Sequence, residues 1–432
     1  MHMNRRDFIK CTSYSASLAL AASHFPAMAR ASKPPLGRIV VIGGGYAGAA
    51  VAKYLRLWSL GALEVIVVEK NPQFVSCPLS NLVIGGSKTI DELTFGYDLL
   101  KSHHGIKWVQ DEVIAIDASN KKVTLQRGEL NYDRLVIAPG IDFIYDDLHM
   151  LQSPEAQNQV PHAWKAGWQT VNLRQQLEAM PDGGVFVMNV PKAPYRCPPG
   201  PYERAAQVAY YFKQHKPKSK VIVLDANGEI TSKKGLFTKV FNEVYTGLVD
   251  YRPNNTIVEV DITHKTVKTE FDSVKADVLN IIPPQRAGKP AQMVKIDQQK
   301  TGLNNIDQRW CEIDFLTYES KLARDIHVIG DAISAALPKS AHMATNQAKI
   351  CANAIVQLMA GHAPDPAPVF ANTCYSYVSN TSAIHVAHVY RYDLDKKVMV
   401  AAEGGGVSLK PSEQEGQYAA AWAQNIWADT LT

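Results

Sequence analysis

The sequence lacks any run of apolar residues long enough to span a membrane, although hydrophobic residues make up 46% of its 432 residues. It also lacks a strong charge of one sign, since a formal net charge of +4 gives no reason to expect a nucleic-acid partner. No cysteine stands in a C-x-x-C-H pattern, so the sequence has no motif for attaching a c-type haem, and we expect no metal site. What remains is the composition of a globular protein with two or three domains.

The first residues have the pattern of an export signal. Residues 4–10 contain a twin-arginine pair, a mildly apolar stretch follows, and residues 27–29 form a small-x-small cleavage site. A membrane anchor is the alternative, but the apolar stretch is short and is interrupted by His24 and Pro26. We therefore expect residues 1–29 to direct export to the periplasm by the twin-arginine route and then to be removed.

The cysteines are few, and export would allow some of them to form a disulfide. One of the six leaves with the expected signal, and an odd number of five means that at least one stays outside an internal disulfide. Spacing alone does not select a pair. The six are Cys11, Cys77, Cys197, Cys311, Cys351 and Cys374. Cys351 falls in a helix-like stretch and is expected in the core, whereas Cys311 has no assigned role.

A dinucleotide-binding pattern occupies the start of the expected mature chain. The apolar run of residues 38–42 reads as a buried parallel strand, and a glycine-rich loop at residues 43–48 follows it directly. Residues 49–57 are helix-like, and residues 64–69 form a second strand. A plain glycine-rich turn is the alternative, but it explains neither the two strands nor the helix.

Each residue of this pattern has a physical role in holding a dinucleotide. Gly43 permits the tight turn, Gly45 lets the backbone approach a pyrophosphate, and Gly48 lets the helix pack closely on the strand. The helix N-terminus then faces the phosphates. Glu69 can accept hydrogen bonds from the adenosine ribose, and we assign the neighbouring Lys70 to the same site.

Two further segments indicate that the nucleotide is FAD. Residues 132–140 resemble the strand and turn of two-dinucleotide flavoproteins, where the backbone passes close to the nucleotide. Residues 325–332 resemble the second FAD fingerprint of that superfamily, in which an aspartate after a strand and a glycine binds the ribityl chain. The predicted flavin-contacting residues of these segments are Ala138, Pro139, Gly140, Gly330 and Asp331.

A second strand–helix–strand unit has lost its glycine loop. Residues 184–190, 202–212 and 220–225 predict the strand, helix and strand of a domain that would bind NAD(P)H. The loop at residues 190–203 carries prolines instead of glycines, and prolines lack the N–H donors that hold a pyrophosphate. Nicotinamide is therefore not the expected electron partner, and Cys197 stands in this loop.

The predicted fold class is α/β, with two Rossmann-like domains of the glutathione-reductase type and a C-terminal α+β domain. We expect a discontinuous FAD-binding domain at residues 36–150 and 292–361. The second Rossmann-like domain covers residues 151–291, and a domain that caps the flavin or meets a partner covers residues 362–432. One apolar helical stripe is expected in the last domain, formed by Tyr418, Trp422, Ile426 and Trp427. It would either belong to the core, or cap the flavin or meet the cytochrome.

Five long and unusual segments resemble the flavoprotein subunit of flavocytochrome c sulfide dehydrogenase. They are residues 76–86, 161–167, 195–204, 282–288 and 372–376. The resemblance implies that Cys77 bonds the 8α-methyl carbon of FAD as a thioether, although a buried unreactive cysteine is the commoner fate of this residue. It also implies a c-type cytochrome subunit as the partner, in a heterodimer.

The resemblance further implies a redox-active disulfide between Cys197 and Cys374, with a purely structural disulfide as the alternative. Hydrosulfide, a small inorganic sulfur substrate, would attack this disulfide and leave a persulfide and a thiolate, and the thiolate would reduce the flavin. Glu203 resembles the acid/base residue beside the disulfide, but a carboxylate at a helix N-terminus is also common. Which cysteine faces the flavin, and which sulfur product forms, are left open.

Two other functions compete with this one. A sulfide:quinone oxidoreductase has similar flavin and cysteine chemistry, but it would need a membrane-binding amphipathic segment with basic flanks, and the C-terminal stripe has almost no basic residues. A non-catalytic flavin protein that relays electrons in an exported complex would not depend on Cys197.

Overall fold

The structure is a computed structural model that describes residues 36–303 and 309–432. The expected export signal lies outside the described residues. Residues 36–432 form one compact unit, so the domain boundaries given above stay a prediction. Among the described residues, no helix is both long and apolar enough to cross a membrane.

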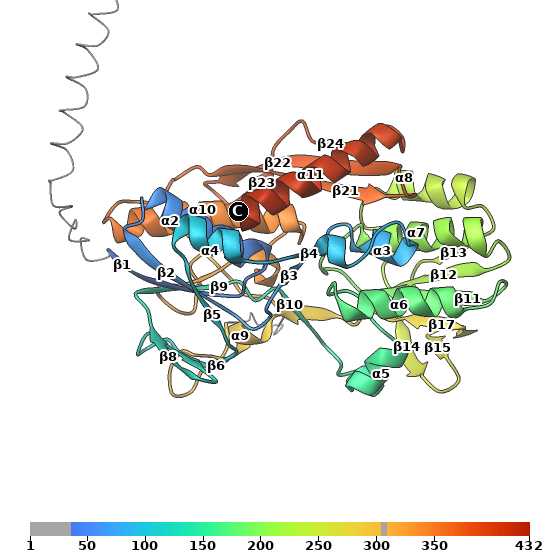
Figure 1. The fold of residues 1–432 in the computed structure, drawn as a ribbon, viewed down its shortest axis with the longest axis horizontal. Helices are drawn as coiled ribbons and strands as arrows, with labels where there is room; N and C mark the ends of the chain where they lie inside the picture. Colours follow the sequence, from blue (N-terminus) through green and yellow to red (C-terminus); the bar gives the residue numbers. More distant parts are fainter. Residues whose placement is uncertain (1–35, 304–308) are drawn as a thin grey trace, which may run out of the picture. The chain divides into compact units, whose positions relative to one another are not determined.

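A five-stranded parallel sheet forms the first layer of the fold (Figure 1). Its strands are rich in Val and Ile and are covered on both faces, as expected of a parallel sheet. Helix α2 (Tyr46–Trp58) packs against it and against α10 (Ala341–Met359). In spatial order, the strands are β20 (Ile326–Val328), β9 (Arg134–Ile137), β1 (Gly37–Ile42), β2 (Leu63–Glu69) and β5 (Lys107–Gln110).

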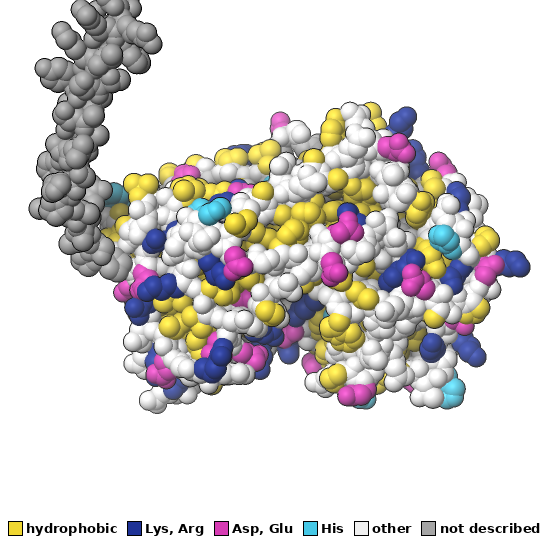
Figure 2. Space-filling model, in the orientation of Figure 1, with side chains coloured by type: hydrophobic (Ala, Val, Ile, Leu, Met, Phe, Trp, Pro, Cys, Tyr) yellow, Lys and Arg dark blue, Asp and Glu magenta, His cyan; other side chains and the backbone are white. Residues whose placement is uncertain are grey.

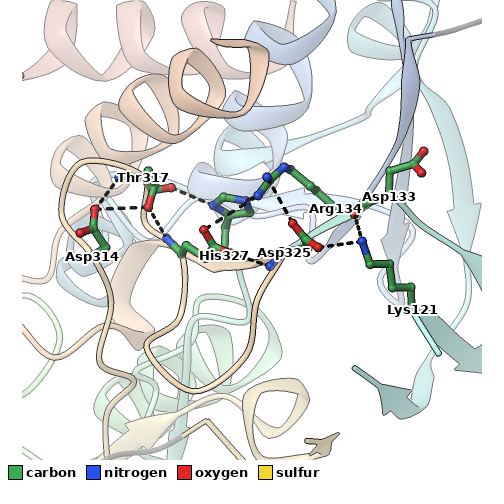
Figure 3. A network of polar contacts seen from close by, with 8 residues as sticks. Lys121, Asp133, Arg134, Asp314, Thr317, Asp325 and His327 are labelled. Carbon is green, nitrogen blue, oxygen red and sulfur yellow. Dashed lines mark hydrogen bonds and ion pairs between the residues drawn. The ribbon is translucent and has the colours of Figure 1, made fainter. Parts of the chain in front are cut away.

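A cluster of polar side chains around the buried His327 ties two of these strands together (Figure 3). Arg134 on β9 pairs with Asp325, 3.2 Å away, and donates a hydrogen bond of 3.2 Å to Nε2 of His327 on β20. His327 in turn donates from Nδ1 to the carbonyl oxygen of Thr317 at 2.8 Å. Desolvation lowers the pKa of His327 to about 4, so the imidazole is neutral and these two hydrogen bonds fix its orientation.

A second parallel sheet contains the second strand–helix–strand unit, the one that lacks a glycine loop. Helices α6 (Trp168–Ala179) and α7 (Gly200–His215) pack on it, and α8 (Lys234–Lys239) follows its second strand. In spatial order, its strands are β13 (Val249–Arg252), β12 (Lys220–Asp225), β11 (Val185–Val190) and β17 (Val278–Asn280). Strands β1, β2, β11 and β12 lie where the apolar runs predict strands, and the α/β class is confirmed.

A C-terminal antiparallel sheet and one long helix complete the fold. The sheet comprises β21 (Val369–Tyr377), β22 (Ala383–Asp393), β23 (Val398–Ala401) and β24 (Gly406–Val407). Helix α11 (Glu413–Leu431), red in Figure 1, packs on this sheet and also contacts α2 and α4 (Asp98–His104).

Tyr418, at one end of the predicted apolar stripe of α11, is 49% exposed, so the core interpretation of the stripe does not hold at this residue. The buried face consists mainly of small residues at helical spacing: Gly416, Ala419, Ala423 and Ile426. A side chain at Gly416 would lie 1.8 Å from the carbonyl oxygen of Thr381. Close approach of the helix to the sheet therefore requires small residues on this face, and the aromatic side chains are displaced to its edges.

Smaller elements connect these layers. They are β3 (Phe74–Val75), α3 (Ser80–Gly85), β4 (Thr94–Phe95), β6 (Val113–Asp117), β7 (Lys122–Leu125), β8 (Gly128–Asn131), β10 (Ile141–Phe143), α5 (Pro154–Gln159), β14 (Ile257–Asp261), β15 (Thr266–Thr269), β16 (Ser273–Lys275), β18 (Gln285–Ala287), α9 (Lys289–Gln292) and β19 (Val294–Lys295).

Candidate functional site

The glycine loop between β1 and α2 packs closely against the backbone of the helix. Gly43 has a φ of +100°, which only glycine adopts readily. A Cβ on Gly48 would lie 1.7 Å from the carbonyl oxygen of Gly43, so the helix and the loop touch through backbone. A Cβ on Gly45 would instead meet no atom within 4 Å, and this residue precedes the first turn of α2. The loop thus presents a helix N-terminus to open space, which is the arrangement that binds a pyrophosphate.

Glu69 is held at the end of β2 beside this loop. One carboxylate oxygen accepts the N–H of Gly44 at 2.6 Å, and the other accepts the N–H of Asn71 at 2.8 Å. The neighbouring Lys70 does not contact the loop: its side chain is 64% exposed, and its ammonium lies 4.0 Å from Glu112. Its assignment to the nucleotide stays a prediction.

The turn after β9 closes over the glycine loop. The carbonyl oxygen of Ala138 lies 2.4 Å from the point that a Cβ on Gly43 would occupy. The carbonyl oxygen of Pro139 packs equally closely, at 2.5 Å, on the Cβ position of Gly288. Gly140 has a φ of +64° and no atom within 4 Å of its Cβ position. Ala138 therefore packs directly on the glycine loop, and Pro139 and Gly140 follow it in the same turn.

Asp331 follows β20 and the left-handed Gly330, whose φ is +76°. Its Oδ1 atom is shielded from solvent and has no hydrogen-bond partner within the described part of the chain. Desolvation raises the pKa of this carboxyl group, and the charges of Arg196 and Lys339 oppose that shift. An orphaned carboxylate oxygen fits a hydroxyl group of a polyol, so the residues present fit FAD at this position.

The two cysteines predicted to act together are held by consecutive residues. Cys197 precedes α7 with a φ of +56°, and its N–H donates to the carbonyl oxygen of Lys339 at 2.7 Å. Cys374 lies on β21, and its sulfur accepts a hydrogen bond of 3.4 Å from Asn372. The Asn372 oxygen in turn accepts the hydroxyl of Ser340 at 2.8 Å. Residues 339 and 340 thus bring together two cysteines that are far apart in the sequence.

This tether also reaches the flavin residues. The Lys339 ammonium is buried and donates to the carbonyl oxygens of Asp331, at 2.9 Å, and Ile333, at 2.6 Å. The structure does not join the sulfurs of Cys197 and Cys374, so their pairing as a disulfide stays a prediction. Desolvation raises the pKa of Cys197 to about 12, and the charges of Glu203 and Cys374 add to that rise.

Glu203 stands in the first turn of α7, next to the cysteines. Its two carboxylate oxygens accept the N–H of Tyr377 at 2.7 Å and the side-chain amide of Asn81 at 2.9 Å. Desolvation raises the pKa of this carboxyl group, and the hydrogen bonds from Tyr377 and Asn81 oppose that rise. Its position at a helix N-terminus agrees with both roles given above, so the acid/base role stays a prediction.

Arg196 connects the flavin residues to the cysteines, and it was not among the predicted site residues. Its side chain hydrogen-bonds Cys77, and the negative charges of Cys77, Asp331 and Cys197 raise its pKa against the effect of desolvation. Its backbone N–H donates to the Gln285 side chain at 2.8 Å. One guanidinium therefore lies within electrostatic reach of three residues predicted for the flavin and the disulfide.

Cys77 lies between β3 and α3, and an aromatic network fixes the residue before it. The Ser76 hydroxyl lies 2.7 Å from the hydroxyl of Tyr46 and accepts the indole N–H of Trp427 at 3.0 Å. Tyr46 is the first residue of α2, directly after the glycine loop. Cys77 is thereby placed beside the dinucleotide fingerprint and the C-terminal helix.

Sequence reasoning missed the polar residues around the cysteines. No local pattern marks Lys233, Lys339 or Asn372, since each acts through a tertiary contact. Arg196 had one signal, its position next to a cysteine in a loop that lost its glycines. A cavity of about 260 Å³ also opens against this loop, lined in part by Pro198 and Lys339. In the described part of the chain, no cluster of side chains is suited to a metal ion.

Three family models match the chain. The model described as pyridine nucleotide-disulphide oxidoreductase matches residues 37–149. The model for the central part of the sulfide dehydrogenase (flavocytochrome c) flavoprotein chain matches residues 170–283, which include Cys197. The model for the flavin-binding part of flavocytochrome c sulphide dehydrogenase matches residues 366–431, which include Cys374.

Individual relatives agree with these models. A sulfide dehydrogenase (flavocytochrome c) flavoprotein chain of Chlorobaculum thiosulfatiphilum is 50% identical over 46 residues, which cover 94% of that relative and 11% of this chain. The mitochondrial sulfide:quinone oxidoreductase of Dictyostelium discoideum is 24% identical over 335 residues, 72% of this chain and 69% of the relative. A solved sulfide:quinone oxidoreductase from Aquifex aeolicus superposes with a TM-score of 0.73 over 91% of both chains, at 17% identity, and supports the fold.

Proposed function

Because the chain belongs to the family of sulfide dehydrogenase (flavocytochrome c) flavoprotein chains, we propose that it oxidises hydrosulfide with FAD and a cysteine pair. The observation that carries the proposal is the tether of Lys339 and Ser340, which fixes both cysteines to the segment that follows Asp331. A cysteine pair held in this way is in position to exchange electrons with a flavin bound by Asp331.

The cysteines do the sulfur chemistry. Hydrosulfide attacks the disulfide of Cys197 and Cys374, one S–S bond breaks, and a new S–S bond forms on one cysteine as a persulfide. The other cysteine leaves as a thiolate with the electron pair of the broken bond. A second hydrosulfide, or another acceptor, takes the outer sulfur of the persulfide and leaves a second thiolate. FAD, when bound, would accept the electron pair released as the two thiolates re-form the disulfide. Glu203 exchanges protons beside Cys197, and the cavity against the proline loop admits the small anion.

We also propose that Cys77 attaches the flavin covalently as an 8α-S-cysteinyl thioether. The support is local: Cys77 is only half-buried, its neighbour Ser76 is fixed by Tyr46 and Trp427, and Arg196 bonds its side chain. A cation beside a thiol favours the thiolate, which is the nucleophile that such a bond needs.

The electron acceptor in this proposal is a c-type cytochrome subunit. The chain has no haem motif of its own, and the matched family carries flavocytochrome c in its name. Hydrophobic side chains gather around α11 on the face shown in Figure 2, and exposed apolar residues nearby include Leu409, Val407 and Tyr418. Such a surface suits a protein partner.

Sulfide:quinone oxidoreductase remains the second candidate, because relatives of that name match most of the chain. Turnover with two acceptors separates the candidates. Purified protein given sulfide should reduce a c-type cytochrome, Cys197→Ser should abolish this, and Cys351→Ala, a change at a buried cysteine of α10, should not. Reduction of decylubiquinone without reduction of cytochrome would favour the quinone enzyme. Equal activity of Cys197→Ser and wild type would refute the cysteine mechanism and favour a non-catalytic electron relay.

We propose that the protein works in the periplasm after export by the twin-arginine route. The support is the twin-arginine pair and the cleavage pattern of residues 27–29. Replacement of Arg5 and Arg6 by Lys should leave the protein in the cytoplasm with its signal attached, as judged by cell fractionation. Normal periplasmic accumulation of that double variant would contradict the proposed route.

A further inference from the structure

A buried lysine lies beside Cys374, on a segment that the sequence did not mark. Lys233 ends the loop between β12 and α8 with a left-handed φ of +54°, and it is only 7% exposed. Its ammonium donates hydrogen bonds of 2.8 Å to the carbonyl oxygen of Cys374 and of 2.8 Å to the hydroxyl of Ser376. The side chain therefore reaches from the second Rossmann-like unit to the strand that carries one of the two cysteines.

The charged groups that act on this ammonium are all acidic. They come from four places in the fold: Cys374 on β21, Glu203 on α7, Cys197 before α7 and Glu415 on α11. A buried ammonium is costly unless negative groups compensate it, so the position is specific. Desolvation lowers the pKa of Lys233 to about 8, and the negative groups limit that fall.

We propose that Lys233 is a positioning residue that holds a positive charge beside Cys374 and stabilises the anion that forms on that sulfur when the disulfide opens. The inference rests on the redox role proposed above for Cys374. It assigns a function to a residue that touches the backbone of Cys374 rather than the substrate.

Disulfide opening places a negative charge at or next to Cys374 in either direction of attack. If hydrosulfide attacks Cys197, the S–S bond breaks and Cys374 leaves as a thiolate with the bonding electron pair. If hydrosulfide attacks Cys374, Cys197 leaves as the thiolate, and the outer sulfur of the persulfide on Cys374, a stronger acid than a thiol, loses its proton. A fixed ammonium beside Cys374 lowers the energy of each of these anions.

The adjacent lysine provides a matched control. Lys234 carries the same charge, but its side chain is 59% exposed and forms an ion pair with Glu229. Lys234→Met therefore removes one positive charge without changing the surroundings of Cys374. Lys233→Arg keeps a charge at the buried position, and Lys233→Gln keeps a hydrogen-bond donor there while removing the charge.

The test measures the thiolate of Cys374 directly. Fully reduced protein is alkylated with iodoacetamide at neutral pH, and modification of the Cys374 peptide is followed by mass spectrometry. We expect Lys233→Gln and Lys233→Met to slow alkylation of Cys374 about tenfold, while Lys233→Arg and Lys234→Met stay near the wild-type rate. Wild-type alkylation in Lys233→Gln would overturn the inference, as would an equal loss in Lys233→Arg. FAD content and the unfolding midpoint establish that each variant folds. If Lys233→Met does not fold, Lys233→Gln alone tests the loss of the charge.

A second readout separates this inference from the proposed function. The rate at which sulfide bleaches the flavin should fall about tenfold in Lys233→Gln, in line with the lost thiolate stabilisation. If sulfide fails to bleach the wild-type protein, the proposed function is refuted, whereas the alkylation result still tests the charge. If wild type and Lys233→Gln bleach at equal rates, only the role of Lys233 is refuted.

Discussion

Gly48→Ala tests whether the glycine loop is built as tightly as the structure indicates. The new Cβ would lie 1.7 Å from the carbonyl oxygen of Gly43 and 2.8 Å from its carbonyl carbon, and neither backbone atom can rotate away. Helix α2 must therefore move from β1 by more than 1 Å, since real Cβ contacts stay above 3.0 Å. Overpacking of this kind costs about 1–3 kcal/mol, which is roughly a 5- to 150-fold change in an equilibrium constant.

That displacement falls on the N-terminus of α2, which faces the open space next to Gly45. We expect Gly48→Ala to bind FAD at least about fivefold more weakly than wild type and to unfold at a lower temperature. FAD content after dialysis and a thermal unfolding curve measure both effects. Gly128→Ala is the control, because a Cβ there meets no atom within 4 Å. Wild-type FAD binding and stability in Gly48→Ala would refute the packing argument.

Three further predictions concern single side chains. Cys77→Ser should keep bound FAD but release it on acid precipitation, whereas the wild-type pellet should stay yellow; a colourless wild-type pellet would exclude the thioether. Asp331→Ala should weaken FAD binding by about 1.5–3 kcal/mol, the worth of a hydrogen bond to a charged group, and leave the FAD-free protein at least as stable, because the orphaned carboxylate is desolvated. Wild-type FAD binding together with a less stable FAD-free protein would contradict the assignment of Asp331 to FAD binding. His327 has a folded pKa of about 4, below its ordinary 6.5, so its contribution to stability is full above pH 6.5 and is lost as the pH falls towards 4, by about 3 kcal/mol in all. The free energy of unfolding of His327→Gln, measured with urea, should therefore depend less steeply on pH over this window than that of wild type. Part of the pH dependence should remain, because His162 also has a lowered pKa, of about 3. An unchanged pH dependence would contradict the neutral, buried imidazole.

The local patterns of the sequence predicted the strands and loops well, because each depends on neighbouring residues. The apolar run before Gly43 became β1, and the run that ends at Glu69 became β2. The proline-rich loop before α7 also lies between the expected strand and helix. Such elements follow from hydrophobic period and from glycine and proline geometry, which a sequence displays directly.

The surroundings of the cysteines could not be predicted, because they come from distant parts of the chain. Lys233 and Lys234 look alike in the sequence, yet the fold buries the first against β21 and exposes the second. Arg196 gains its role only where Cys77 and Asp331 approach it. The exposure of Tyr418 has a related cause, since close packing of α11 on the sheet buries the small residues of the helix instead.

The measurement that tests the central claim most directly is an anaerobic titration of the purified, FAD-loaded protein with sulfide, followed through the flavin absorbance. The account predicts that sulfide bleaches the wild-type flavin and leaves that of Cys197→Ser yellow. A flavin that stays oxidised in wild type, or bleaches equally in Cys197→Ser, would contradict sulfide oxidation through this cysteine pair.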